Sequence, residues 1–148
     1  MNQVHGSFIR RCSAGFTLIE LMVVVAVVAV LGTIAVPAYG DYVSRARANA
    51  ALFALLGYQL KMEQRYLESM RYGEDEECAV PVPEVEQFEF SCSLDEGGRR
   101  YTITATGVGG ARGYAYSINQ SGQRKTLEHP KGVPSRSCWS VKGGRCDI

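Results

Sequence analysis

The segment GFTLIELMVVVAVVAVLGTIAVPAYG, residues 15–40, decides the fold because it contains no charged residue after Glu20. About 20 apolar residues in a helix rise about 30 Å, roughly the thickness of the hydrocarbon core of a bilayer. A single span in lipid is helical because its backbone polar groups must pair within the segment. The alternative is a secretory signal peptide behind Arg10 and Arg11, but the apolar run is longer than the usual core of such peptides.

Glu20 stands at the edge of this apolar run. A carboxylate in such a place costs a few kcal/mol unless it is paired. One interpretation is a side chain that reaches the membrane interface or is protonated there. The other is a charge paired with a second group, and the residues that precede Glu20 favour this interpretation.

Ser13 and Ala14 precede the run Gly15-Phe16-Thr17-Leu18-Ile19-Glu20, and a short basic leader lies before them. This pattern resembles the processing site of the type IV pilin family. The resemblance implies that a prepilin peptidase cuts between Gly15 and Phe16 and then N-methylates Phe16. It also implies that the apolar helix is kept in the mature protein and that residues 1–15 are removed.

The resemblance gives Glu20 a role in assembly. It implies that Glu20 of an incoming subunit pairs with the Phe16 amine of a subunit already in the filament. Two charges attract more strongly in lipid than in water, so the pair would fix the register of the helices. Gly32 and Pro37 both weaken a helix, and in the pilin family this region can extend when the subunit enters the fibre.

The chain is expected to have an α+β fold, in which a long N-terminal helix packs on a four-stranded antiparallel sheet. Residues 1–15 form the leader, residues 16–40 the membrane or filament-core helix, and residues 41–148 the head. In the head the helix continues to about residue 72, a loop covers 73–86, the sheet covers 87–128, and a loop covers 129–148. The strands are expected at 87–93, 100–106, 113–119 and 124–128, separated by short turns that favour a meander.

The continuing helix carries two apolar stripes at helical spacing. One contains Ala46, Ala50, Phe53, Leu60 and Leu67, and the other contains Ala48, Leu52, Leu55, Met62 and Tyr66. Two stripes suit a helix that packs on a sheet and also touches neighbouring subunits. A helix with a single broad core face is an alternative of equal weight. Gly57 is expected to bend the helix, and Gly73 to cap it.

Four of the five cysteines remain once Cys12 leaves with the leader. An even number in an exported domain favours two disulfides. Spacing does not choose among the three pairings, of which we favour Cys78–Cys92 and Cys138–Cys146. The second would close a loop similar to the C-terminal disulfide loop of type IV pilins, and the segment around it is most similar to the PilE- and ComP-like minor pilins.

Charge is distributed unevenly along the chain although the formal net charge is only +1. Residues 63–96 hold 11 acidic residues and two arginines, whereas residues 99–148 hold nine basic and two acidic residues. A basic surface can bind phosphate groups, and aromatic faces such as Tyr114, Tyr116 and Trp139 can stack on bases. The favoured alternative is that the acidic and basic parts face each other, within the fold or between subunits. The candidate DNA contacts are Arg112, Arg124, Lys125, Lys131, Arg136, Trp139, Lys142 and Arg145.

No set of residues suits an enzyme, a metal site or a cofactor. The Gly-rich run at 107–113 opens no helix and is expected to be a turn, and His129 is expected at the surface. The sequence therefore predicts a structural subunit of a type IV pilus that supports twitching motility, adhesion or DNA uptake. A minor pilin is favoured over a major pilin. The alternatives are a pilus-associated DNA-uptake receptor and a pseudopilin of type II secretion.

The resemblance also implies partners and a location. The expected partners are other pilin subunits, the prepilin peptidase that also methylates, the pilus assembly platform and, in the receptor interpretation, DNA. The subunit would cross the bacterial inner membrane once before assembly and would then be part of the extracellular pilus.

Overall fold

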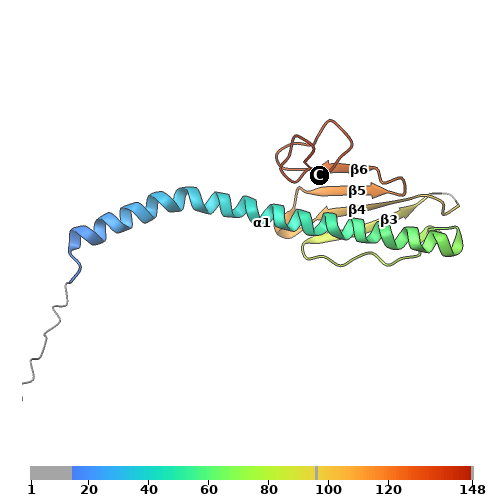
Figure 1. Ribbon diagram of the computed structural model, residues 1–148, viewed down its shortest axis with the longest axis horizontal. Helices are drawn as coiled ribbons and strands as arrows, with labels where there is room; N and C mark the ends of the chain where they lie inside the picture. Colours follow the sequence, from blue (N-terminus) through green and yellow to red (C-terminus); the bar gives the residue numbers. More distant parts are fainter. Residues whose placement is uncertain (1–14, 96, 148) are drawn as a thin grey trace, which may run out of the picture. The chain divides into compact units, whose positions relative to one another are not determined.

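The computed structural model describes residues 15–95 and 97–147, so most of the expected leader, including Cys12, lies outside the described residues. A single long helix precedes all the strands (Figure 1). The elements are α1 (Leu18–Ser69), β1 (Gly73–Glu74), β2 (Glu77–Cys78), β3 (Phe88–Leu94), β4 (Tyr101–Gly107), the 3₁₀ turn η1 (Gly109–Ala111), β5 (Ala115–Asn119) and β6 (Arg124–Glu128). The chain divides into two compact units between Ala38 and Tyr39, and each unit is described by itself.

The described part of the first unit is an apolar helix with exposed side chains. By length and composition α1 is able to cross a membrane, since its most apolar 18-residue stretch has a mean hydropathy of 2.7. The helix runs through Gly32 and Pro37 without a break. Large apolar side chains on all sides of this segment are exposed. Such a surface is unfavourable in water and is suited to contact with lipid or with a neighbouring protein.

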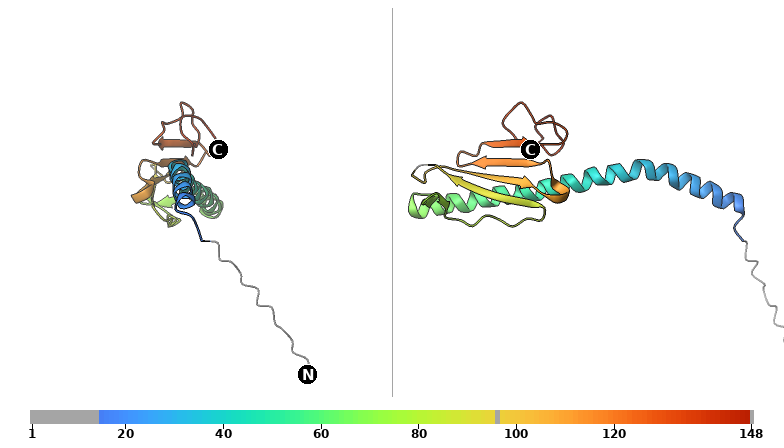
Figure 2. Two further views of the ribbon diagram at one scale, coloured as in Figure 1. Left: turned by 90° about the vertical axis from the view of Figure 1, so that its left-hand side faces the viewer. Right: turned by 180° about the vertical axis from the view of Figure 1, so that it is seen from behind.

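The second unit, the head, contains a four-stranded antiparallel sheet in the order β3-β4-β5-β6. Figure 2 shows the head from two further sides, with α1 along one face of this sheet. The alternation expected for the second strand is observed, since Tyr101, Ile103, Ala105 and Gly107 are buried and the residues between them are more exposed. The meander is therefore as expected, with strand ends shifted by one or two residues.

Only one of the two apolar stripes of α1 enters the core. Ala48, Leu52, Leu55 and Met62 are buried against sheet residues such as Ile103, and Tyr66 packs at the edge of this core. The other stripe is exposed, which shows that the alternative of a single broad core face is wrong. Gly57 does not interrupt the helix.

The end of α1 differs from the expectation. The helix ends at Ser69 rather than near Tyr72, because Met70 has a φ of 56° and its N–H bonds to the Tyr66 carbonyl, as in a left-handed helix cap. Gly73, expected to be the cap, lies instead in β1. It is packed so tightly that a Cβ there would lie 2.0 Å from the Glu77 carbonyl oxygen.

The expected loop at 73–86 contains a small hairpin, which corrects the expectation. Strands β1 and β2 pair through the register Gly73↔Cys78 and Glu74↔Glu77. Asp75 and Glu76 form the turn with φ values of 51° and 68°, a geometry that Asn and Gly normally supply. The acidic turn residues therefore hid the hairpin in the sequence.

Buried tyrosines make the head sensitive to alkaline pH. Burial raises the pKa of Tyr58 to about 12, and burial together with a hydrogen bond to Glu63 raises the pKa of Tyr72 to about 12. The folded protein disfavours ionisation of these tyrosines. Their contribution to the free energy of unfolding is therefore fully present below pH 10, the pKa of a tyrosine in the unfolded chain, and is lost as the pH rises towards 12. We expect a loss on the order of 1–2 kcal/mol per tyrosine, measured by denaturant unfolding from pH 9 to 12. A smaller loss is expected for Tyr58→Phe, and an equal loss in that variant would contradict the assignment.

Candidate functional site

The processing motif lies immediately before α1. Gly15, Phe16 and Thr17 are exposed and precede the first helical residue, Leu18. The Thr17 hydroxyl oxygen accepts a hydrogen bond from the Glu20 N–H over 3.2 Å, which caps the helix. Thr17-Leu18-Ile19-Glu20 is thus a capping sequence of the form T-x-x-E, a signal that the sequence analysis missed.

Glu20 lies in the first turn of α1 with its side chain exposed. A carboxylate is favourable there because the first backbone N–H groups of a helix carry partial positive charge. Within residues 15–95 and 97–147, the ion pairs do not include Glu20. The described residues therefore leave the charge of Glu20 without an ion-pair partner.

The second candidate region is the C-terminal segment, residues 129–147, which lies beside β6 (Figure 1). Trp139 anchors it, since the side chain is fully buried and its Nε1–H donates to the Ser117 carbonyl over 2.9 Å. Tyr116 donates from its hydroxyl to the Ser140 carbonyl over 3.0 Å, and burial raises its pKa. These bonds fasten the segment to β5.

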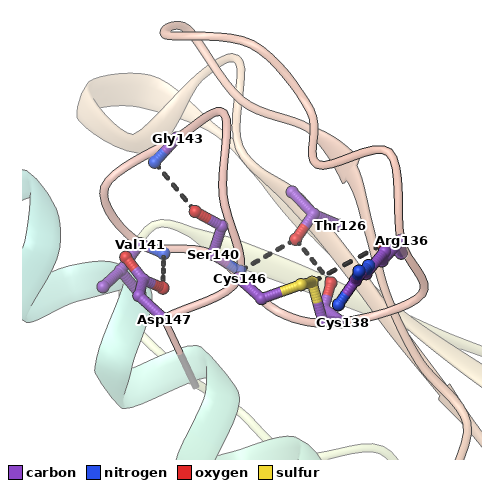
Figure 3. The surroundings of a disulfide bond; sticks show 8 residues. All are labelled: Thr126, Arg136, Cys138, Ser140, Val141, Gly143, Cys146 and Asp147. Carbon is purple, nitrogen blue, oxygen red and sulfur yellow. Dashed lines mark hydrogen bonds between the residues drawn. A yellow bond between two sulfur atoms is a disulfide. The ribbon is translucent and has the colours of Figure 1, made fainter.

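A disulfide between Cys138 and Cys146 closes the end of this segment, and Cys78–Cys92 joins β2 to β3, as in the favoured pairing. Figure 3 shows the groups around the C-terminal bond. The Asp147 carboxylate accepts the N–H groups of Val141 and Lys142, both over 2.8 Å. The closed loop is thus held by backbone donors as well as by the covalent bond.

The structure sorts the candidate DNA contacts into three groups. Arg124 lies over the ring of Trp139, 4.9 Å from its centroid, and Lys131 pairs with Asp41 of α1 and lowers the pKa of that carboxyl. Trp139 is wrong as a contact, because a fully buried ring cannot stack on a base. The exposed members without an ion pair or ring contact among the described residues are Arg112, Lys125, Arg136, Lys142 and Arg145.

The aromatic surface expected for stacking is also mostly absent from the part of the chain that is described. Tyr116 is buried, and Tyr114 is half-buried with its ring edge-on to His129 at 4.9 Å. His129 is buried rather than at the surface, and its Nδ1 accepts the Lys131 N–H over 3.0 Å. DNA binding at β6 and the C-terminal segment would therefore depend on charge more than on stacking by Tyr114, Tyr116 or Trp139.

Arg136 and Arg145 both line a hollow of about 300 Å³ that also includes Cys146 of the C-terminal disulfide. Pro134, Ser135 and Gly144 complete its wall. Two guanidinium groups around one hollow can hold a phosphate, since each presents a fork of N–H donors.

The acidic and basic parts of the head are not paired with each other to any large extent. Among the described ion pairs, only Arg100–Asp95 joins a basic residue of 99–148 to an acidic residue of 63–96. This pair lies in the turn between β3 and β4. Many of the acidic side chains lie on the β1–β2 hairpin and in or before β3, whereas six of the nine basic ones, from Arg124 onward, lie on β6 and after it. Because β3 and β6 are opposite edges of the sheet, pairing of the two parts among the described residues is limited to this one contact.

Two models of known protein families match this chain. Residues 37–119 match the family described as "Type IV minor pilin ComP, DNA uptake sequence receptor", and residues 10–36 match the prokaryotic N-terminal methylation motif. The type IV major pilin PilE1 of Neisseria gonorrhoeae is 39% identical over 69 residues, which are 47% of this chain and 32% of PilE1. The fimbrial protein EcpC of Eikenella corrodens is 32% identical over 99 residues, 66% of this chain and 65% of EcpC.

Two solved structures share the fold. A type IV pilin from Shewanella oneidensis has a TM-score of 0.50 at 17% identity, covering 66% of this chain and 98% of that one. The minor pilin PilV of Neisseria meningitidis has a TM-score of 0.51 at 15% identity, covering 64% and 97%.

A capped apolar helix that continues into an α+β head with a C-terminal disulfide loop defines a pilin. The chain belongs to the type IV pilins, in the family of the minor pilin ComP. It matches the first curated relatives over about a third of their own length.

Proposed function

We propose that this protein is a subunit of a type IV pilus, stored in the inner membrane and polymerised through α1. The observation that carries the proposal is the exposed Gly15-Phe16-Thr17 motif directly before a capped apolar helix of pilin type. Cleavage after Gly15 creates an ammonium group at Phe16. Methylation keeps that charge, and Glu20 provides the carboxylate that pairs with it in the next subunit.

The direct test is to ask where the chain is found in the cell that produces it. Pili are sheared from the cells and probed for the mature chain, and membranes are probed in parallel. The proposal expects the mature chain in both fractions and a methylated Phe16 in its N-terminal peptide. Detection of the chain only among the components of a secretion system, with no copies in sheared pili, would favour the pseudopilin alternative.

A second function, binding of double-stranded DNA, is favoured by the exposed basic side chains on β6 and the C-terminal segment. Arg136 and Arg145 would together hold a phosphate at their hollow, and Lys125 and Lys142 would add charge along the backbone of the DNA. The family description names a DNA uptake sequence receptor, which supports the same proposal.

The variant Arg136→Ala/Arg145→Ala is expected to bind duplex DNA at least tenfold more weakly than the natural protein at low salt. Each lost phosphate contact should also reduce the slope of log affinity against log salt by about 1. The measurement is a titration of labelled duplex at several salt concentrations. The matched control is Lys61→Ala/Arg99→Ala, which removes two exposed cations elsewhere in the head. An equal loss in the control, or no binding by the natural protein, would contradict the site.

A further inference from the structure

Tyr72 makes a hydrogen bond that the proposed function does not use. Its side chain is only 5% exposed, and its hydroxyl donates to both carboxylate oxygens of Glu63 over 3.1 Å. Burial, together with this hydrogen bond, raises the pKa of the Tyr72 phenol to about 12. The phenol therefore keeps its proton at neutral pH and holds that proton directly against a base.

The contact between Tyr72 and Glu63 has the geometry of an oxidisable tyrosine. A phenol that loses an electron becomes a very strong acid, so oxidation is easier when a base within hydrogen-bond distance can take the proton. The hydroxyls of two other buried tyrosines, Tyr58 and Tyr116, donate to backbone carbonyls, which are much weaker bases than a carboxylate. Among the hydrogen bonds of the described residues, Tyr72 is thus the buried tyrosine best prepared to lose an electron and a proton together.

A second tyrosine, Tyr66, stacks on the ring of Tyr72. The two ring centroids are 4.7 Å apart and the ring planes differ by 27°. Tyr66 is half-buried in the last turn of α1, so its ring can meet an oxidant from solution and can turn about its side-chain bonds. Tyr101 also lies 4.7 Å from Tyr72, but the two rings meet at 66° and Tyr101 is only 1% exposed. The pair that is placed to react is therefore Tyr66 and Tyr72.

We propose that Tyr66 and Tyr72 form an oxidative cross-linking site, in which Glu63 accepts the phenol proton of Tyr72. The oxidants are one-electron oxidants from solution, such as organic peroxyl radicals. A first radical takes an electron from the accessible Tyr66 and becomes a peroxide anion, and the phenol proton of Tyr66 goes to water. Tyr66 then regains an electron from Tyr72 through the stacked rings and a proton from water, while the proton of Tyr72 moves to Glu63.

A second peroxyl radical oxidises Tyr66 again, so that both tyrosines are neutral radicals. A C–C bond forms between the ring carbons next to the two phenol oxygens. Each of these carbons passes its hydrogen, through water, to the phenol oxygen as the ring regains its aromaticity, and Glu63 releases its proton to water. In total the chain loses two electrons and two protons, and each of the two oxidants gains one electron.

The cross-link closes the turn at the end of α1. Residues 67–71 lie between the two tyrosines and include Met70, whose positive φ ends the helix. A covalent bond across this turn holds the end of α1 beside the start of β1 and gives the head a permanent record of oxidation. The inference does not depend on the proposed function, because both tyrosines and Glu63 belong to a single head.

The test exposes the detergent-purified full chain, diluted so that copies do not meet, to light with tris(bipyridyl)ruthenium and persulfate, which generate a one-electron oxidant. Trypsin cuts after Arg65, Arg71 and Arg99, so Tyr66 and Tyr72 fall in the adjacent peptides 66–71 and 72–99. The cross-linked pair weighs two hydrogens less than the sum of these peptides, whereas an uncleaved peptide 66–99 weighs one water less. We expect this pair to be the main cross-linked product, with the fluorescence of dityrosine.

Three variants separate the roles of the side chains. Tyr66→Phe is expected to remove the product. Glu63→Gln keeps the size of the side chain and a hydrogen-bond acceptor but is not a base, so it is expected to lower the yield about tenfold while thermal unfolding shows that the head is still folded. The matched control is Tyr58→Phe, which removes a buried tyrosine bonded to a carbonyl and should leave the yield unchanged.

The contrary results are equally definite. Tyr39 and Tyr42 are 70% and 71% exposed, so an oxidant that reacts by access alone would modify them first. If cross-links form mainly at these two tyrosines, the proposal is overturned. It is also overturned if Glu63→Gln yields as much of the product that joins Tyr66 to Tyr72 as the natural chain does.

Discussion

Replacing Glu20 with alanine is expected to leave the subunit processed and in the membrane but to reduce its amount in pili at least tenfold. The Glu20 side chain makes no ion pair within the described residues, so the head gains nothing from it. Its partner in the proposed mechanism is the Phe16 ammonium of another subunit. Removing one member of a buried ion pair costs about 3–5 kcal/mol, because the other charge is left alone in an apolar surrounding.

The measurement is the ratio of mature chain in sheared pili to mature chain in membranes. Glu20→Gln is the informative second variant, because it keeps the size and polarity of the side chain and removes only the charge. A substitution of Gly15, such as Gly15→Asp, provides the unprocessed control, which should remain longer than the mature chain. If Glu20→Gln assembles as well as the natural protein, the charge pair has no role in assembly.

The sequence predicts the periodic parts of this fold well. Alternation in Tyr101–Gly107 and the apolar spacing of Leu52, Leu55 and Met62 are local patterns, and burial of one face follows directly from them. The capping sequence Thr17-Leu18-Ile19-Glu20 is equally local, but it was not among the predicted features. The β1–β2 hairpin was not, because Asp75 and Glu76 adopt positive φ values that their residue types rarely show.

The candidate basic surface was predicted less well, because burial of a side chain in an irregular segment depends on contacts distant in sequence. Trp139 bonds to Ser117, 22 residues away, and His129 is covered by Tyr114. Neither contact leaves a periodic trace in the sequence. Residue type alone made Trp139 a candidate for base stacking and placed His129 at the surface, and the structure reverses both assignments.

The role of Trp139 can be separated from that of the basic side chains by mutation. Trp139→Ala is expected to destabilise the head by about 3–5 kcal/mol, because it removes a fully buried indole and leaves a cavity. It also leaves the Ser117 carbonyl without its Nε1–H donor and removes the ring beneath Arg124. The C-terminal segment should then detach from β5, and the exposed arginines should lose their fixed positions.

We therefore expect Trp139→Ala to weaken DNA binding although the indole cannot reach DNA. Arg145→Ala should weaken binding too, but with an unchanged Tm and a smaller salt slope. Trp139→Phe is the matched control, since it keeps a buried ring and loses only the N–H donor, so its Tm should fall by less. The measurements are thermal unfolding and a DNA titration on each variant. A Trp139→Ala protein with the natural Tm would contradict the anchoring role. Full DNA affinity in a destabilised Trp139→Ala would show that the basic surface needs no anchor.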